Sequence, residues 1–374
     1  MPEFARNLVF SALAVLAALL LGAVVLWISG YDVLEALGAL ALGASGSINA
    51  NAETLLTTTP LLLAALAVAI GLRGGLFNIG VEGQFLLGGL ASVWVGSHLT
   101  FLPGPLLLPV ILLAGMAGGA VWAAIAGILK ARFGAHEVIT TIMLNYIAMK
   151  GVAYLVRGPL HGPGPIPQTP YIMETAHLPI LIPDTRLHAG LLLALLIALA
   201  VWWFLWKTPW GFAMRAVGLN PAAAEYAGVG MRRTLVGTMA LSGALAGMAG
   251  GVQIAGVDFR LVQEGFSAGY GYDSIAVSLL GLNSPFGIIL AAWLFAALRS
   301  GAAQMQVDAG VSSQIISVLQ ALVILLVAAE AGIRHTFDLA KQKRRTATAT
   351  GAVCPPITQD RNSSAATPSP REQN

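Results

Sequence analysis

The sequence has little charge and almost no cysteine. Asp, Glu, Lys and Arg make up 10% of the 374 residues, whereas 57% are hydrophobic. Soluble domains carry about 25% charged residues, so the composition excludes a soluble globular domain and predicts an all-α, polytopic membrane protein. The single cysteine, Cys354, lies in a polar stretch near the C-terminus. A disulfide framework and a thiolate metal site are therefore excluded.

Motifs for ATP hydrolysis, metal binding and nucleophilic catalysis are absent too. No G-x-x-x-x-G-K-S/T occurs, so the chain lacks a P-loop. His136-Glu137 begins an H-E-x-x-H pattern, but Thr140 stands where the second zinc ligand would be. Gly265–Gly269 fits G-x-S-x-G, in a glycine-rich loop without the strand that a nucleophile elbow needs. We therefore predict that the chain is not an enzyme, has no metal or cofactor, and binds no nucleic acid, because it lacks a basic stripe.

Long apolar runs make up most of the chain. A helix of roughly 20 apolar residues crosses a bilayer, and runs of this kind mark the predicted membrane segments. They lie at about residues 8–28, 54–72, a stretch ending near 96, 106–129, 137–156, 190–206, 235–254, 274–300 and 311–329.

Positively charged residues near the ends of these runs set the predicted orientation. Arg73 and Arg232 lie on the side of the membrane that carries most of the cations. The positive-inside rule predicts that this side, which also holds both termini, is cytoplasmic. Two cytoplasmic termini require an even number of crossings. We therefore divide 274–300 at Asn283-Ser284-Pro285 into two half-helices that enter and return. The prediction is about ten segments, some of them broken or re-entrant.

The composition changes near the C-terminus. Residues 335–374 are polar and rich in Ser, Thr and Pro, which is typical of a disordered segment. We predict a membrane domain over 1–334 and a cytoplasmic tail over 335–374.

The stretch Arg73–Gln84, RGGLFNIGVEGQ, is too rich in glycine and polar groups for a lipid-facing helix. Unwound backbone at membrane depth is tolerated only where protein or a water-filled cavity surrounds it. Asn78, Glu82 and Gln84 therefore either hold a broken helix together or line a translocation path. An intramembrane carboxylate such as Glu82 is costly and favours a functional role.

Further amides lie in or near the apolar runs. Asn145 falls in the middle of 137–156, where it either bonds a neighbouring helix or faces the path. Gln253 and Asn283 lie near the ends or breaks of later runs. Uncharged amides suit a neutral, hydrogen-bonding solute better than an ion. We therefore predict that Asn145, Gln253 and Asn283 join the translocation path.

The polar stretch Lys207–Thr234 interrupts two apolar runs and is basic. Asn220 is a plausible N-cap with Pro221 at the first helical position, and Gly228 or Gly230 can end the short helix that follows. A solvated connector on the positive side would need no such order. We therefore interpret the stretch as a coupling helix on which a separate ATPase docks.

The heptapeptide LAGMAGG occurs twice, at Leu113–Gly119 and Leu245–Gly251. In the predicted topology these two runs cross the membrane in opposite directions. The repeat fits either inverted halves or independent helix packing through GxxxG pairs.

Five motifs resemble a known family of transporters. The motifs are GLFNIGVEGQ (Gly75–Gln84), EVITTIMLNYIA (Glu137–Ala148), RAVGLNPAAAEYAGV (Arg215–Val229), IAVSLLGLNSPFG (Ile275–Gly287), and Met305-Gln306 followed by Gln320. They resemble the permease subunits of bacterial ABC importers for branched-chain amino acids, ribose-type sugars and nucleosides. Within that family the chain is most similar to the nucleoside type.

The resemblance implies a transmembrane permease subunit of an ATP-driven nucleoside importer in a bacterial inner membrane. Its partners would be an ABC ATPase at the inner face, a second and different permease subunit, and an external solute-binding protein. The resemblance also implies that Arg215–Val229 is the ATPase-docking segment, in which we expect the coupling residues Arg215, Gly218, Asn220, Pro221, Ala223, Glu225, Tyr226 and Gly228.

Two alternatives stay open. The same kind of permease could carry a sugar or a branched-chain amino acid. An ion-coupled secondary carrier would need no ATPase, and Glu82 would be its titrating residue.

Overall fold

The computed structural model describes residues 16–17, 20–99, 101–263, 265–312, 314–318, 321–322 and 325–326. All of them belong to one compact unit, Met1–Glu330. Over this part of the chain the structure is helical, with two isolated β-bridges and no strand. The all-α prediction is confirmed, whereas the predicted tail at 335–374 and Gln320 lie outside the described residues.

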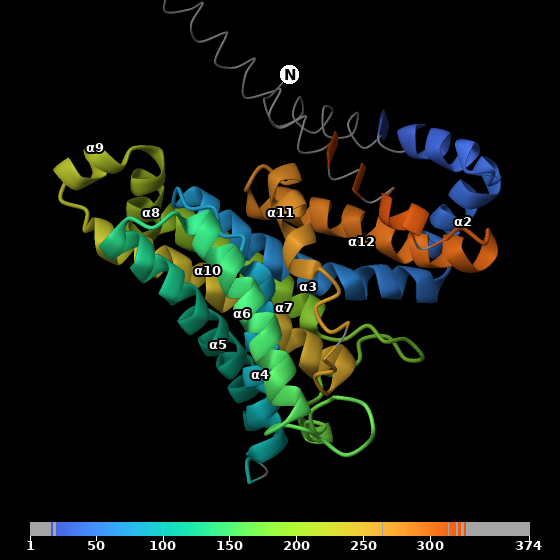
Figure 1. The fold of residues 1–374 in the computed structure, drawn as a ribbon, viewed down its shortest axis with the longest axis horizontal. Helices are drawn as coiled ribbons and strands as arrows, with labels where there is room; N and C mark the ends of the chain where they lie inside the picture. The colour runs from blue at the N-terminus through green and yellow to red at the C-terminus, as the bar shows by residue number, and fades with distance from the viewer. Residues whose placement is uncertain are drawn as a thin grey trace, which may run out of the picture. The chain divides into compact units, whose positions relative to one another are not determined.

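Of the α-helices whose two ends both lie within the described residues, seven are 18 residues or longer and four are shorter. Figure 1 shows their arrangement. The long helices are α3 (Ile48–Arg73), α4 (Val81–His98), α5 (Gly104–Phe133), α6 (Glu137–Arg157), α7 (Gly190–Lys207), α10 (Met231–Gln253) and α12 (Pro285–Asp308). The short ones are α2 (Val33–Ser45), α8 (Pro209–Leu219), α9 (Pro221–Tyr226) and α11 (Tyr270–Leu280). A 3-10 turn, η1 (Glu174–Ala176), and a π-helical turn, η2 (Ile254–Asp258), complete the described elements.

Six of the described helices are long and apolar enough to cross a membrane: α3, α5, α6, α7, α10 with η2, and α12. The predicted number of about ten segments is therefore not confirmed. The predicted segments 8–28 and 311–329 are described only in part. Helix α11 has only 11 residues, which is too short to cross a bilayer, since about 20 are needed.

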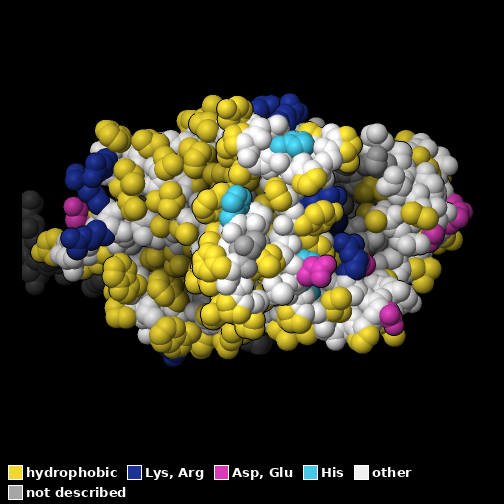
Figure 2. Space-filling view, turned by 90° about the horizontal axis from the view of Figure 1, so that it is seen from below, with side chains coloured by type: hydrophobic (Ala, Val, Ile, Leu, Met, Phe, Trp, Pro, Cys, Tyr) yellow, Lys and Arg dark blue, Asp and Glu magenta, His cyan; other side chains and the backbone are white. Residues whose placement is uncertain are grey.

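Helix α3 forms the centre of the helical core. In the most apolar 18 residues of α3, 83% of the residues are buried inside the protein. The corresponding share is 28% in α5, 22% in α6 and 28% in α7. The side chains from Leu61 to Ile70 are almost completely buried. The other three helices expose large apolar side chains, and Figure 2 shows a face on which hydrophobic side chains predominate. These outer helices present the surface that a lipid bilayer would cover.

Helices α5 and α10 approach each other along glycines. A Cβ atom added to Gly119 would lie 2.1 Å from the carbonyl oxygen of Gly243, and one added to Gly247 would lie 2.1 Å from that of Gly115. The order of these contacts makes the two helices antiparallel, as the topology predicted. The two LAGMAGG copies therefore pack on each other, which is the small-residue packing of membrane helices.

Helices α11 and α12 form a hairpin at the predicted interruption. Leu282 and Asn283 in the turn have positive φ angles of 56° and 52°. Arg299 of α12 donates to the Asp273 carboxylate at 3.1 Å and to the Ala268 carbonyl at 2.6 Å, so α12 returns along α11. The second limb is longer than the predicted half-helix, because α12 continues to Asp308.

Candidate translocation path and coupling surface

The chain between α3 and α4 is non-helical and is held by side-chain amides. Asn78 donates to the Gln84 side chain at 2.9 Å and to the Ser242 hydroxyl of α10 at 2.8 Å. Its carbonyl oxygen accepts from the Gly80 backbone at 2.9 Å and from the Gln84 amide at 3.0 Å. Asn78 and Gln84 are both 1% exposed. One of these bonds pairs the backbone N–H of Gly80 in the non-helical stretch, and the other three pair buried side-chain groups with one another.

Asn145 of α6 also holds this non-helical segment, residues 74–80, which we call the break. Its side-chain oxygen accepts from the Gly83 backbone N–H at 2.9 Å, and its amide donates to the Ile79 carbonyl at 2.8 Å. The Asn145 side chain is 1% exposed. One amide therefore pairs two backbone groups on either side of the start of α4, where helical bonds are lacking.

Glu82 connects the start of α4 with the start of α11. Its carboxylate accepts hydrogen bonds from the Ser267 hydroxyl and, at 2.9 Å, from the Gly271 backbone N–H. The residue is 4% exposed. Negative charge in the first turn of α4 is also stabilised by the helix dipole. Glu82 thus connects the loop before α11, and the first turn of α11, to the start of α4.

The structure brings four of the six predicted path residues together and places two elsewhere. Asn78, Glu82, Gln84 and Asn145 surround the break, as their hydrogen bonds show. Gln253 donates to Asp258 at 3.0 Å at the end of α10.

Asn283, the sixth predicted path residue, sits in the α11–α12 turn. It accepts from the Ser278 hydroxyl at 2.9 Å. Sequence reasoning missed Ser242 and Ser267, which complete the network at the break. A buried carboxylate or amide requires such donors and acceptors, but nothing in the sequence shows which serines supply them.

The predicted N-cap of the central stretch is confirmed, because Asn220 accepts from the Ala223 N–H at 3.1 Å and begins α9. A second cap was not predicted: Thr208 accepts from the Gly211 N–H at 3.1 Å and begins α8. Pro221 is at the first position of α9, and Gly228 follows its end with φ +83°. We call α8, α9 and their link to α10 the coupling unit. Figure 1 shows α9 at the edge of the helical assembly.

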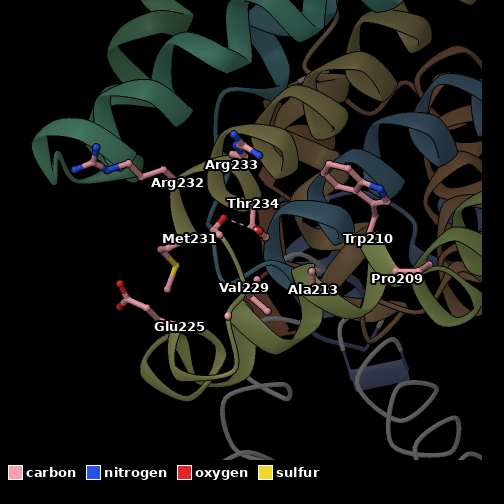
Figure 3. Close-up of a pocket in the computed structure, with 11 residues that line it drawn as sticks. Pro209, Trp210, Ala213, Glu225, Val229, Met231, Arg232, Arg233 and Thr234 are labelled. Atoms are coloured by element: carbon pink, nitrogen blue, oxygen red, sulfur yellow. Dashed lines mark hydrogen bonds between the residues drawn. The ribbon is translucent and has the colours of Figure 1, made fainter.

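The coupling unit exposes large side chains beside a groove. Tyr226 is 97% exposed and Leu219 is 86% exposed. The groove has a volume of about 810 Å³ and lies between α8, Glu225 and the start of α10 (Figure 3). Its lining residues are Pro209, Trp210, Ala213, Glu225, Gly228, Val229, Gly230, Met231, Arg232, Arg233 and Thr234. Arg215, by contrast, donates to the Leu205 carbonyl at 3.0 Å and so faces α7.

The coupling unit touches the break directly through two glycines. A Cβ atom on Gly218 would lie 2.3 Å from the Arg73 carbonyl oxygen and 2.8 Å from the Gly75 nitrogen. Arg73 in turn donates to the carbonyls of Asn283 at 3.0 Å and Leu282 at 3.2 Å. The end of α8, the end of α3 and the α11–α12 turn therefore meet at Arg73.

The described residues contain no group of His, Cys, Asp or Glu side chains that could hold a metal ion. What the geometry offers is a buried set of amides and one carboxylate, connected by backbone contacts to an exposed, capped unit.

Comparison with known families agrees with this architecture. The family described as branched-chain amino acid transport system / permease component matches residues 50–328, and the chain belongs to it. The protein is therefore a multi-pass membrane protein of the ABC permease class.

Individual relatives cover nearly the whole chain. The guanosine ABC transporter permease protein NupP of Bacillus subtilis is 42% identical over 90% of this chain and 97% of its own length. The nucleoside ABC transporter permease protein NupB of Lactococcus lactis is 37% identical over 86% and 91%, respectively. The glucose ABC transporter permease protein TsgB13 of Haloferax volcanii is 38% identical over 89% and 90%. No solved structure matches the chain.

Proposed function

We propose that this chain is one of two permease subunits of an ATP-driven importer, and that the importer carries nucleosides. The relatives named for guanosine and nucleosides support the substrate class. The uncharged amides around the break support a neutral solute. One observation carries the coupling to ATP: the exposed coupling unit packs through Gly218 against Arg73 and Gly75 of the broken segment.

The proposal includes three protein partners. An ABC ATPase docks on the coupling unit from the cytoplasm, and an external binding protein delivers the solute. The second permease in this proposal is a different chain. The guanosine permease NupQ of Bacillus subtilis, which is 29% identical over 66% of this chain and 79% of its own length, supports this. This chain has no P-loop motif, so ATP hydrolysis belongs to the ATPase alone.

The proposed orientation places both termini in the cytoplasm of a bacterium, with about ten membrane segments in 1–334 and a disordered tail in 335–374. The six apolar helices support part of this topology. Arg73, Arg215 and Arg232 then lie on the cytoplasmic side together with the coupling unit.

The proposed mechanism is alternating access between two conformations that the ATPase biases. Closure of the ATPase dimer displaces α9 and α8. Gly218 transmits this movement to Arg73 and Gly75, because no side chain separates the two backbones. Arg73 also contacts the α11–α12 turn. Both broken segments therefore shift together, and with them the groups around Asn78 and Asn145.

Transport by the purified complex tests the proposal. Proteoliposomes that hold both permeases and the ATPase should accumulate guanosine only when the binding protein and internal ATP are present. Vesicles with an ATPase whose P-loop lysine is replaced serve as the control and should accumulate none. Uptake that persists with this inactive ATPase would contradict the proposal.

A sugar importer is the second candidate, because the glucose permease TsgB13 is 38% identical to this chain. Uptake of labelled uridine, glucose, ribose and leucine in a deletion strain separates these substrates. An ion-coupled carrier is tested by Glu82→Gln, which should leave ATP-driven uptake measurable. If Glu82→Gln abolished uptake while substitutions at Asn220 and Tyr226 had no effect, the ATP-driven mechanism would be wrong.

A further inference from the structure

Helix α6 is buried along one narrow stripe, and the rest of its surface is half-buried or exposed. The buried stripe consists of Thr141, Asn145, Ala148, Val152 and Val156. Three polar or aromatic side chains follow one another at intervals of four residues on the exposed surface. They are Tyr146, which is 58% exposed, Lys150, and Tyr154, which is 71% exposed. Four residues rise by about 6 Å, so these side chains form a line along the helix.

The two other outer helices show what a lipid-facing surface looks like in this protein. Between Leu106 and Ile128 of α5, every exposed residue is apolar. The same holds between Leu192 and Trp203 of α7. A lysine that faces hydrocarbon is costly, and ionisable groups in membrane helices usually face the bundle interior or water. The line on α6 therefore marks a surface that lipid does not cover.

A second phenol lies beside this line. Tyr272 of α11 is 45% exposed, and the side chains of Asn145, Tyr146 and Glu82 lie close to it. Tyr272 thus joins the exposed line on α6 to the buried network at the break. We call Tyr146, Lys150, Tyr154 and Tyr272 the tyrosine face.

We propose that the tyrosine face lines the translocation path and binds the nucleobase by stacking on Tyr146 and Tyr272. The inference rests on the proposed nucleoside importer and adds the residues that contact the solute. A nucleobase has an aromatic face, which stacks on tyrosine rings, and polar edges, which phenols and an ammonium group can hydrogen-bond. Glucose has no aromatic face. The tyrosine face would therefore favour nucleosides over sugars.

Thiol labelling tests whether the tyrosine face is wet and whether a nucleoside covers it. Because Cys354 is the single cysteine, Cys354→Ser gives a cysteine-free background. Tyr146→Cys, Tyr272→Cys and the lipid-facing control Leu196→Cys are introduced one at a time. The assembled complex in lipid nanodiscs is treated with a charged, water-soluble methanethiosulfonate. The two path thiols should react at least about tenfold faster than the Leu196→Cys thiol, because charged reagents do not enter hydrocarbon.

Protection identifies the solute. Guanosine-loaded binding protein with ATP should slow the reaction at positions 146 and 272 severalfold, whereas glucose should not. Equal reaction rates at the path and control positions would overturn the proposal, and so would labelling that guanosine does not slow. If the thiols cross-linked to the second permease instead of reacting with the reagent, the tyrosine face would be a subunit interface. That result would also overturn the proposal. Labelling needs no net transport, so its failure differs from a failure of ATP-driven uptake.

Aromatic replacement gives an independent readout. Tyr146→Phe keeps the ring and should retain guanosine uptake within about twofold, whereas Tyr146→Leu should lower it about tenfold. Leu199→Met on α7 is the matched control and should change nothing. Membrane abundance of each variant is measured in parallel. Equal uptake by the Phe and Leu variants at equal abundance would refute stacking on Tyr146.

Discussion

The coupling unit and the break between α3 and α4 are organised in opposite ways. The coupling unit is exposed, and its helices are capped by neighbours in sequence, Thr208 and Asn220. The break is buried, and its bonds come from α6, α10 and the loop before α11. A partner can therefore grip the first region without unfolding it. The second region depends on contacts that hold the membrane core together, so its failure affects stability first.

The largest effect is expected at the break. Asn145→Leu leaves the buried Gly83 N–H without this partner, at about 1–3 kcal/mol, and removes the part-buried bond to the Ile79 carbonyl as well. We expect a marked loss of folded protein and of uptake, measured by detergent-resistant yield and by guanosine transport. The control is Gln306→Leu, since that amide is exposed near the end of α12. A fully stable Asn145→Leu variant would show that the break does not need this amide.

The contact between the two regions should give the next largest effect. Gly218→Leu places a side chain where even a Cβ atom would lie 2.3 Å from the Arg73 carbonyl oxygen. The coupling unit is then displaced from the break, and we expect uptake to fall at least about tenfold, in line with the cost of an overpacked contact. ATP hydrolysis by the bound ATPase should continue. Gly237→Ala, at a helical glycine with open space around it, should leave both activities intact.

A smaller effect is expected on the exposed side of the coupling unit. Tyr226→Ala removes a ring that is 97% exposed, so the permease itself should keep its stability. Affinity for the ATPase should fall about tenfold, as for an aromatic interface residue, and co-purification of the two subunits measures this. Phe101→Ala removes another exposed ring and should not weaken the complex. If the Tyr226→Ala variant bound the ATPase normally, the docking surface would not include Tyr226.

The smallest effect on stability at neutral pH is expected for His188, which belongs neither to the coupling unit nor to the break. Burial, and to a lesser degree the nearby Arg186, lower the pKa of His188 to about 4, whereas an unfolded histidine has a pKa near 6.5. The unfolded chain therefore binds the extra proton between these values. His188 should cost no stability above pH 6.5, and stability should fall as the pH drops toward 4. His188→Asn should flatten that part of a thermal-stability profile, and an unchanged profile would contradict this explanation.

The comparison also shows which features sequence alone can predict. The start and the end of α9 were predictable because Asn220, Pro221 and Gly228 are local signals within nine residues. The interruption at Asn283-Ser284-Pro285 was predictable for the same reason. The partners of Asn78 and Glu82 were not, because Ser242 and Ser267 are brought to them by the packing of distant helices. The expected number of segments was not confirmed, since parity and hydropathy do not reveal where a helix such as α11 stops.

The glycine contact between α5 and α10 restricts how the protein can change shape. Carbonyl oxygens and Cα atoms meet there with no side chain between them, so neither helix can rotate or slide without a backbone collision. The pair should therefore keep a fixed geometry throughout the transport cycle. Conformational change should therefore occur at helix contacts that are made through side chains. Those helices would move relative to α10, which begins at the coupling unit.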